Sequence, residues 1–156
     1  MFVLGGLVCA TWLSAQDYQK TAYGIKAAAG GVDVEVQFFT PSVVRVVKSP
    51  QGEHFEKKSL AVVASPGEVG VKVGIKDGAI VMDTKVLQVN LDTSTGAFSY
   101  RTADGKFLLA EKPVEKPFVP FDDAGDATYN VYQAFKLDAD EAIYGLGQLQ
   151  NGKMSQ

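Results

Sequence analysis

Two clusters of carboxylates are the side chains of this sequence most suited to chemistry. The first cluster contains Asp122, Asp123 and Asp126, and the second contains Asp138, Asp140 and Glu141. Paired carboxylates can act as general acid and base, and carboxylate oxygens can hold calcium. Both clusters lie in polar stretches typical of loops, and neither has the spacing of a known calcium loop. We therefore predict solvated turn residues, with no catalytic residue and no metal ligand in this chain.

The single histidine and a pair of glycines are the other candidates for chemistry. His54 lies in a charged stretch, residues 51–58, and nothing places a nucleophile beside it as a Ser-His-Asp triad would need. One histidine also excludes a multi-histidine zinc site. Gly145 and Gly147 are followed by polar residues rather than by a helix start, so they do not form a phosphate-binding loop. We expect no cofactor.

The elements that must position these residues are predicted to be β-strands throughout. Residues 32–38, 69–75 and 87–91 place apolar side chains at every second position, which gives each strand one buried face. Shorter apolar stretches predict further strands at residues 43–47, 60–64, 79–82, 97–101, 107–109 and 129–137. Turn signals such as Asp77-Gly78 separate the strands, and no long helical pattern intervenes. We predict an all-β fold, an antiparallel β-sandwich.

Prolines interrupt residues 112–121, which therefore cannot form a central strand. We expect this segment to run extended along a surface. Its apolar side chains Phe118, Val119 and Phe121 have no obvious local cover. We predict that several of them belong to a docking surface for another domain.

The first residues differ in composition from the rest. Residues 1–13 are apolar but shorter than the roughly 20 residues that a membrane-spanning helix needs. Small residues then precede Gln16, so we predict a signal peptide at residues 1–15, although no Lys or Arg precedes its apolar stretch. The sole cysteine, Cys9, follows Val8 rather than a small residue, which favours removal of the leader over lipid anchoring. We expect an exported protein, periplasmic or secreted and free of the membrane after cleavage; the alternative is a buried N-terminal strand.

The overall composition fits one globular domain. The chain has 156 residues, of which 46% are hydrophobic and 21% are charged, and its net charge is −3. It carries no basic stripe, so we expect no nucleic-acid partner.

A short apolar stretch near the end of the chain runs into two glycines. Its residues are Ala142, Ile143, Tyr144, Gly145, Leu146, Gly147 and Gln148. The glycines allow a sharp turn or a close approach to another surface. The stretch resembles the Tyr-Gly-(Leu/Phe)-Gly-Glu signature of glycoside hydrolase family 31, with Gln148 where many relatives carry glutamate. Residues 32–46 and 87–96 likewise resemble strands of the N-terminal domain in that family.

The resemblance implies the galactose-mutarotase-like supersandwich for residues 16–141, with residues 142–156 as an exit motif leading toward a catalytic (β/α)8 barrel absent from this chain. It implies the N-terminal, non-catalytic domain of an exported retaining α-glycosidase, either an α-xylosidase or an α-glucosidase. Two aspartates on the barrel would act on an α-linked oligosaccharide. This domain would brace the barrel, and the loop after Gly147 would help to wall the substrate pocket. Tyr144 and Leu146 would join the docking surface, and this chain alone is expected to be inactive.

Two other functions compete with this one. A free-standing, exported carbohydrate-binding sandwich would need exposed aromatic side chains in a row. The mature chain offers Tyr18, Tyr23, Tyr100, Tyr129, Tyr132 and Tyr144. Most of these fall within strands, where packing is the expected role. A sugar epimerase of the mutarotase kind uses paired histidines with a carboxylate, and a single histidine cannot supply them.

Overall fold

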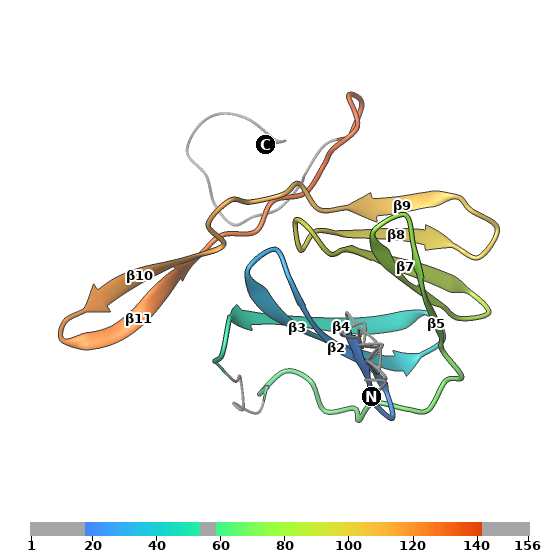
Figure 1. The fold of residues 1–156 in the computed structure, drawn as a ribbon, viewed down its shortest axis with the longest axis horizontal. Helices are drawn as coiled ribbons and strands as arrows, with labels where there is room; N and C mark the ends of the chain where they lie inside the picture. The colour runs from blue at the N-terminus through green and yellow to red at the C-terminus, as the bar shows by residue number, and fades with distance from the viewer. Residues whose placement is uncertain (1–17, 54–58, 142–156) are drawn as a thin grey trace, which may run out of the picture.

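The computed structural model describes residues 18–53 and 59–141, which form strands, turns and extended connections (Figure 1). The first sheet contains β1 (Tyr18–Lys20), β2 (Gly24–Ala29), β3 (Val32–Thr40) and β4 (Val43–Pro50), in that order. The second contains β5 (Lys72–Lys76), β6 (Ala79–Asp83), β7 (Leu87–Asp92), β8 (Phe98–Thr102) and β9 (Phe107–Ala110), also in sequence order. All neighbouring strands in both sheets are antiparallel. Within the described ranges, no helix is long and apolar enough to cross a membrane.

The two sheets pack face to face and enclose the hydrophobic core. Alternate side chains of β3 face inward, and Val34, Val36 and Phe38 are at most 2% exposed. The most deeply buried side chains of the second sheet, which meet them, are Ile80, Met82, Val89, Leu91 and Phe98. This arrangement follows from the period of two along each strand, because successive side chains point to opposite faces of the sheet. The predicted antiparallel β-sandwich is confirmed.

Direct contact between two backbone turns closes one end of the sandwich. The β2–β3 turn contains Gly30 and Gly31, and the β7–β8 turn contains Gly96, all with positive φ. The N–H of Gly30 donates to the carbonyl oxygen of Thr93 at 3.2 Å. A Cβ atom on Gly30 would lie 2.3 Å from the carbonyl carbon of Thr95, so this approach requires glycine. The sheets therefore meet at this end with no side chain between their backbones.

Residues 60–64 do not form the predicted strand. They belong to the long connection between β4, at one edge of the first sheet, and β5, at one edge of the second. Leu60 and Val63 are 98% and 96% exposed. An apolar stretch becomes a strand only where a neighbouring strand pairs with it, and residues 60–64 pair with none of the described strands.

Conversely, β2 forms without a strong strand signal in its sequence. It reads Gly-Ile-Lys-Ala-Ala-Ala, and alanine is depleted in strands. Six consecutive residues of β2 pair with β3, from Gly24 opposite Gln37 to Ala29 opposite Val32. Pairing with the longer strand β3 thus supplies what local propensity lacks.

The remaining strands, β10 (Phe118–Asp123) and β11 (Asp126–Val131), form a hairpin that projects from the sandwich as an arm (Figure 1). Pro120 is tolerated in β10 because each strand of a two-stranded hairpin has a free edge. The first acidic cluster lies at the tip of this arm, where Ala124 and Gly125 adopt positive φ and turn the chain. The segment expected to run extended along a surface is therefore extended, but it continues into a protruding hairpin.

The predicted strand at residues 129–137 is shorter than expected. β11 ends at Val131, and of the following residues Phe135 alone makes an isolated bridge, to Glu111. Side chains 132–137 are mostly exposed, so the chain here follows the edge of the second sheet instead of joining a buried ladder.

Candidate functional site at the open side of the sandwich

An ion pair joins the two sheets at the side where the edge strands β4 and β9 face each other. Lys48 on β4 pairs with the buried Val34 of β3, so its side chain faces the interior. Glu111 directly follows β9. The Nζ atom of Lys48 lies 2.5 Å from Oε2 of Glu111, and the two side chains are 17% and 7% exposed. The same oxygen accepts a hydrogen bond from the N–H of Phe98 at 3.0 Å, so the buried charge is both paired and hydrogen-bonded.

Two aromatic rings surround this ion pair. The ring of Phe98 lies 5.2 Å from Nζ of Lys48, within the range of a cation–π contact, and stacks on Tyr100. Burial raises the pKa of the Tyr100 hydroxyl, and the negative charge of Glu111 raises this pKa further. The phenol therefore stays protonated at neutral pH and keeps its proton available for donation.

The segment after β11 is held against the same edge. The N–H of Lys112 donates to the carbonyl oxygen of Ala134 at 2.9 Å, and the N–H of Lys136 donates to that of Ala110 at 2.8 Å. These bonds flank the bridge between Glu111 and Phe135. The backbone around Glu111 thus anchors the last described part of the chain to the sandwich, next to the ion pair.

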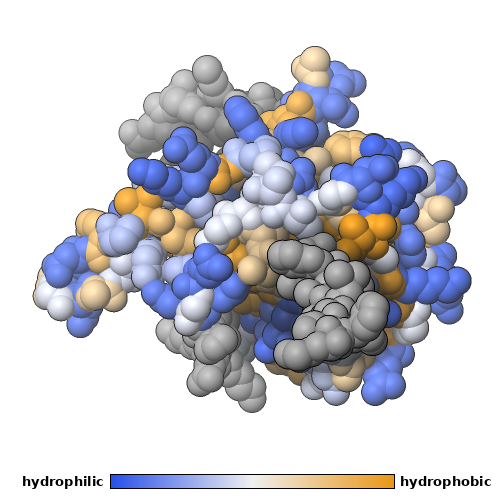
Figure 2. All heavy atoms as spheres, viewed as in Figure 1, coloured by the Kyte–Doolittle hydropathy of each residue, from blue (hydrophilic) through white to orange (hydrophobic). Residues whose placement is uncertain are grey.

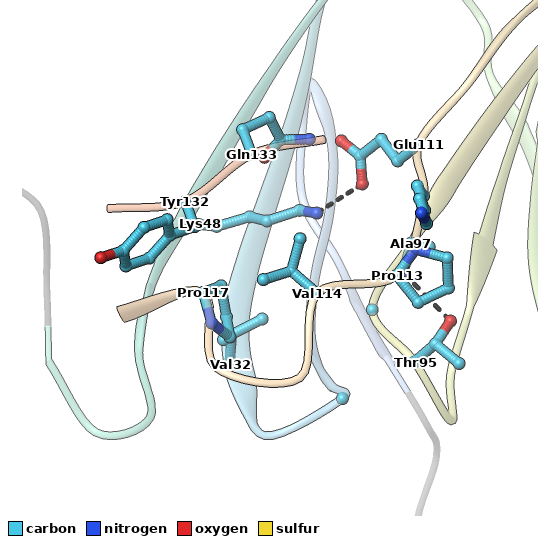
Figure 3. Close-up of a pocket in the computed structure, with 13 residues that line it drawn as sticks. Val32, Lys48, Thr95, Ala97, Glu111, Pro113, Val114, Pro117, Tyr132 and Gln133 are labelled. Carbon is cyan, nitrogen blue, oxygen red and sulfur yellow. Dashed lines mark hydrogen bonds and ion pairs between the residues drawn. The ribbon is translucent and has the colours of Figure 1, made fainter. Parts of the chain in front are cut away.

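Two hollows lie on either side of the ion pair. The smaller, of about 20 Å³, has room for about one water and is lined in part by Val32, Pro117 and Tyr132 (Figure 3). Figure 3 shows the side chain of Gln133 directed toward the carboxylate of Glu111. The larger hollow, of about 330 Å³, opens between β4 and β9. Its lining is Val46, Lys48, Tyr100, Leu109, Glu111, Gln133 and Phe135.

The predicted docking residues of the arm differ in their surroundings. Phe118 is half-buried, packs against the core and meets Tyr129 edge to face with ring centroids 6.2 Å apart. Val119 is half-buried, whereas Phe121 is 47% exposed. The hydroxyl of Tyr129 also donates to Glu53 at 2.5 Å, which ties the arm to the loop after β4. The docking role of these residues stays a prediction.

The exit motif lies outside the described residues. This applies to Tyr144, Gly145, Leu146, Gly147 and Gln148, and equally to the leader and to His54. Their predicted roles therefore stay predictions.

In each of the two acidic clusters, a carboxylate accepts a hydrogen bond from a backbone N–H within a turn. Oδ1 of Asp122 accepts a hydrogen bond from the N–H of Gly125 at 2.9 Å, and Oε2 of Glu141 accepts one from the N–H of Asp138 at 3.2 Å. All six carboxylates are exposed, as expected for turn residues. Over residues 18–53 and 59–141, no three histidine, cysteine or acidic side chains come close enough to hold a metal ion.

Sequence reasoning missed the ion pair that organises this side. A weak signal was present, because Lys48 occupies the inward-facing position that follows Val44 and Val46 along β4. A lysine at such a position indicates a buried charge that needs a partner. Glu111 could not be recognised as that partner, because it is 63 residues away in the sequence.

Comparison with known proteins shows the family of this domain. The family model described as the glycosyl hydrolase 31 N-terminal galactose mutarotase-like domain matches residues 33–156. The chain belongs to this family. The galactose mutarotase-like domain is 29% identical over 124 residues to an α-xylosidase of Saccharolobus solfataricus, an alignment that covers 79% of this chain and 16% of that enzyme.

Two solved structures share the fold of this N-terminal domain. The glycoside hydrolase family 31 α-xylosidase of Xanthomonas citri superposes with a TM-score of 0.76 and 30% identity, over 88% of this chain and 15% of that one. A family 31 α-xylosidase from a soil metagenome, solved with xylose, gives a TM-score of 0.65 at 17% identity, over 90% and 23% of the two chains. The second likeness supports the fold alone. The domain thus spans about a sixth of the first two relatives.

Proposed function

We propose that this domain is the non-catalytic N-terminal part of a retaining α-glycosidase that acts on α-linked xylose or glucose. The family match over residues 33–156 carries the proposal, together with two α-xylosidases of which the chain covers 16% and 15%. The reaction on an α-linked oligosaccharide would then belong to a downstream (β/α)8 domain of the same polypeptide. The sandwich would brace that domain.

The hollows of the described chain support a non-catalytic role. A third hollow, of about 280 Å³, is lined in part by Asp92 and Glu111. Glu111 and Asp92 are therefore the carboxylates that line these three hollows. Glu111 is engaged by Lys48 and by the backbone of Phe98. Asp92 accepts hydrogen bonds from the hydroxyl and N–H of Ser94, at 2.6 and 2.9 Å. Both carboxylates thus have structural partners, whereas a glycosidase needs two free ones facing each other across the bond.

The exit motif and the arm would contribute to the larger enzyme in different ways. We place Tyr144, Leu146 and the loop after Gly147 beside the substrate pocket, as the family signature implies. The exposed Phe121 on the arm, with its neighbours Phe118 and Val119, would contact the following domain.

Export is a separate part of the proposal. The apolar leader at residues 1–15 supports it. N-terminal sequencing of protein secreted from a Gram-negative host should find a mature terminus near Gln16. Intact Met1 in the periplasmic fraction would contradict export with cleavage.

Hydrolysis of aryl α-xyloside and aryl α-glucoside tests the main proposal. The 156-residue chain should show no turnover, while a protein extended through the coding sequence beyond Gln156 should hydrolyse at least one of the two substrates. Turnover by the short chain that disappears in Asp122→Asn or Asp138→Asn would overturn the non-catalytic assignment. A stop codon directly after Gln156 in an intact gene would instead favour a free-standing binding module over a domain of a larger glycosidase.

A free-standing carbohydrate-binding module is the second candidate. The aromatic part of the larger hollow is the observation behind this candidate, because Tyr100 and Phe135 offer aromatic surface next to the amide of Gln133. Its volume of about 330 Å³ lies at the lower limit for small-molecule sites. Titration of the short chain with xylose and with an α-linked oligosaccharide, followed by NMR, distinguishes a binding module from a bracing domain.

A further inference from the structure

The exposed apolar side chains of this domain concentrate near the end of the described chain. Of the fifteen large hydrophobic residues that are exposed within residues 18–53 and 59–141, eight lie between residues 107 and 137. They are Phe107, Leu108, Leu109, Phe121, Val131, Tyr132, Phe135 and Leu137. Figure 2 shows apolar side chains on the arm and on the segment that follows it, among polar neighbours. Of these eight, Leu109 and Phe135 come together in the lining of the larger hollow, and a contiguous exposed apolar patch marks an interaction surface more often than single exposed residues do.

The larger hollow opens to solvent, with the exposed Leu109 and Phe135 in its lining, and it reaches down to half-buried residues of the two sheets. Val46 and Tyr100 line it from strand positions that face inward, and both pack against the core. Protein interiors are packed as closely as organic crystals, with few voids larger than a water molecule. A hollow of about 330 Å³ between two edge strands therefore indicates that the sandwich is incomplete on this side.

We propose that the domain that follows this chain docks on the open side between β4 and β9, and that an apolar side chain of that domain fills the hollow. We call the exposed lining residues Leu109 and Phe135, together with the exposed Leu137 two positions further along the chain, the exit face. The inference rests on the proposed function, because it needs a downstream domain as occupant.

The place where the chain leaves supports this occupant. Residues 134–136 are hydrogen-bonded along the edge of β9, so the chain is held at the exit face just before it continues. The relatives contain roughly six times as much chain, since the match covers 16% and 15% of their length. The position of residues 134–136 along this edge thus favours a downstream domain as the occupant.

The chemistry of the hollow favours an apolar occupant over a sugar. The charges of Lys48 and Glu111 neutralise each other at 2.5 Å, and Glu111 holds the N–H of Phe98 as well. A sugar needs several free polar partners, and beyond this pair the lining offers the hydroxyl of Tyr100 and the amide of Gln133. Leucine, valine and aromatic carbon supply the rest of the lining.

Cysteine labelling, read site by site by mass spectrometry, tests the exit face. In a Cys9→Ser background, Phe135→Cys and Leu137→Cys replace side chains that are 47% and 46% exposed, so neither should disturb folding. Ile75→Cys on β5 is the matched control, because Ile75 is 52% exposed at the far edge of the same sheet. Phe121→Cys reports on the arm.

Each variant is compared in the 156-residue chain and in the protein extended beyond Gln156. We expect the thiols at positions 135 and 137 to react about tenfold more slowly in the longer protein, because burial suppresses thiol reactivity. The thiol at position 75 should react at the same rate in both proteins.

The outcomes separate this inference from the proposed function. If the thiols at positions 135 and 137 stay reactive in a longer protein that hydrolyses aryl α-xyloside, the inferred docking at the exit face is wrong. The proposed function then stands. Protection at position 121 alone would place the docking surface on the arm and overturn the inference. Protection of position 135 in the short chain by xylose would make the hollow a sugar site and also overturn it. A longer protein without glycosidase activity would refute the proposed function, and the inference with it.

Discussion

The turn end and the open side of this sandwich are closed by different means. At the turn end, Gly30 and Gly96 bring two backbones together, and a Cβ atom on Gly30 would meet the carbonyl group of Thr95 within 2.4 Å. At the open side, a single ion pair between Lys48 and Glu111 spans the sheets beside a hollow of about 330 Å³. The turn end is complete within the described residues, whereas the open side has space that these residues do not fill.

The difference follows from the kind of contact that can join the two sheets in each region. Two tight turns can interlock through backbone alone, provided that glycine removes the side chain. Two edge strands of opposite sheets cannot pair with each other across a core about 10 Å thick. Side chains must bridge that gap, so the strength of the open side depends on burial and on whatever covers it.

The ion pair should give the largest effect. Glu111→Ala should lower the free energy of unfolding by about 3–5 kcal/mol, because it leaves the Lys48 ammonium and the Phe98 N–H buried without a partner. Lys26→Met is the control, since Lys26 lies 3.9 Å from Glu35 and its side chain is 56% exposed. Its loss should cost less than about 1 kcal/mol. Urea unfolding followed by circular dichroism measures both.

A double variant sharpens this result. Lys48→Met combined with Glu111→Leu replaces the pair with apolar side chains. It should recover the part of the stability loss that comes from the unpaired Lys48 ammonium, whereas the cost of the unpaired Phe98 N–H remains. Equal, small losses for Glu111→Ala and Lys26→Met would mean that the open side is solvated and that the ion pair does not join the sheets.

The turn end should give the next largest effect. Gly30→Ala should lower the free energy of unfolding by about 2–4 kcal/mol, because alanine disfavours φ +58 and its Cβ would collide with the backbone at Thr95. Gly31→Ala is matched in conformation, with φ +77, but meets nothing within 4 Å. It should cost only about 1–2 kcal/mol. Equal losses in denaturant unfolding would show that backbone conformation, and not contact between the sheets, governs this end.

Substitution of an exposed residue on the exit face should change stability by a smaller amount. This amount should depend on whether the protein extends beyond Gln156. Phe135→Ser should change the stability of the 156-residue chain by less than about 0.5 kcal/mol, because Phe135 is exposed there. In the protein extended beyond Gln156 the same change should cost about 1.5–3 kcal/mol, the value of burying a phenylalanine. Ile75→Ser should behave alike in both proteins. Thermal unfolding of the four variants decides the point, and an unchanged Phe135→Ser effect would contradict docking at the exit face.

The smallest effect concerns pH at the turn end. The hydroxyl of Ser94 and then the N–H of Thr95 lower the pKa of Asp92 below its ordinary value of 3.8. A lowered pKa in the folded state stabilises the fold above that ordinary value, and this contribution is lost as the pH falls through the folded pKa. The stability difference between wild type and Asp92→Asn should therefore be constant from about pH 7 to 5 and shrink below about pH 4. If the stability difference between wild type and Asp92→Asn persists under acidic conditions, the charge of Asp92 does not stabilise the turn. The stability of the turn would then come from its conformation alone.

Much of the fold could be predicted from the sequence, because alternation is a local property. The period of two in residues 32–38 and 87–91 specifies which face of β3 and β7 is buried, and Asp77-Gly78 marks the β5–β6 turn. The Tyr144 motif, read as a family signature, agreed with the family to which the chain belongs. These features need no knowledge of what lies across the core.

Only the tertiary structure decided the rest, since it depends on partners distant in sequence. Residues 60–64 have strand composition but no neighbouring edge, whereas the alanine-rich β2 gains its strand from β3. Glu111 meets Lys48 across 63 positions, and the hollow beside them exists because β4 and β9 come to lie at the same side of two different sheets. Side-chain alternation determines which residues face inward, but pairing and packing between sheets determine what those residues meet.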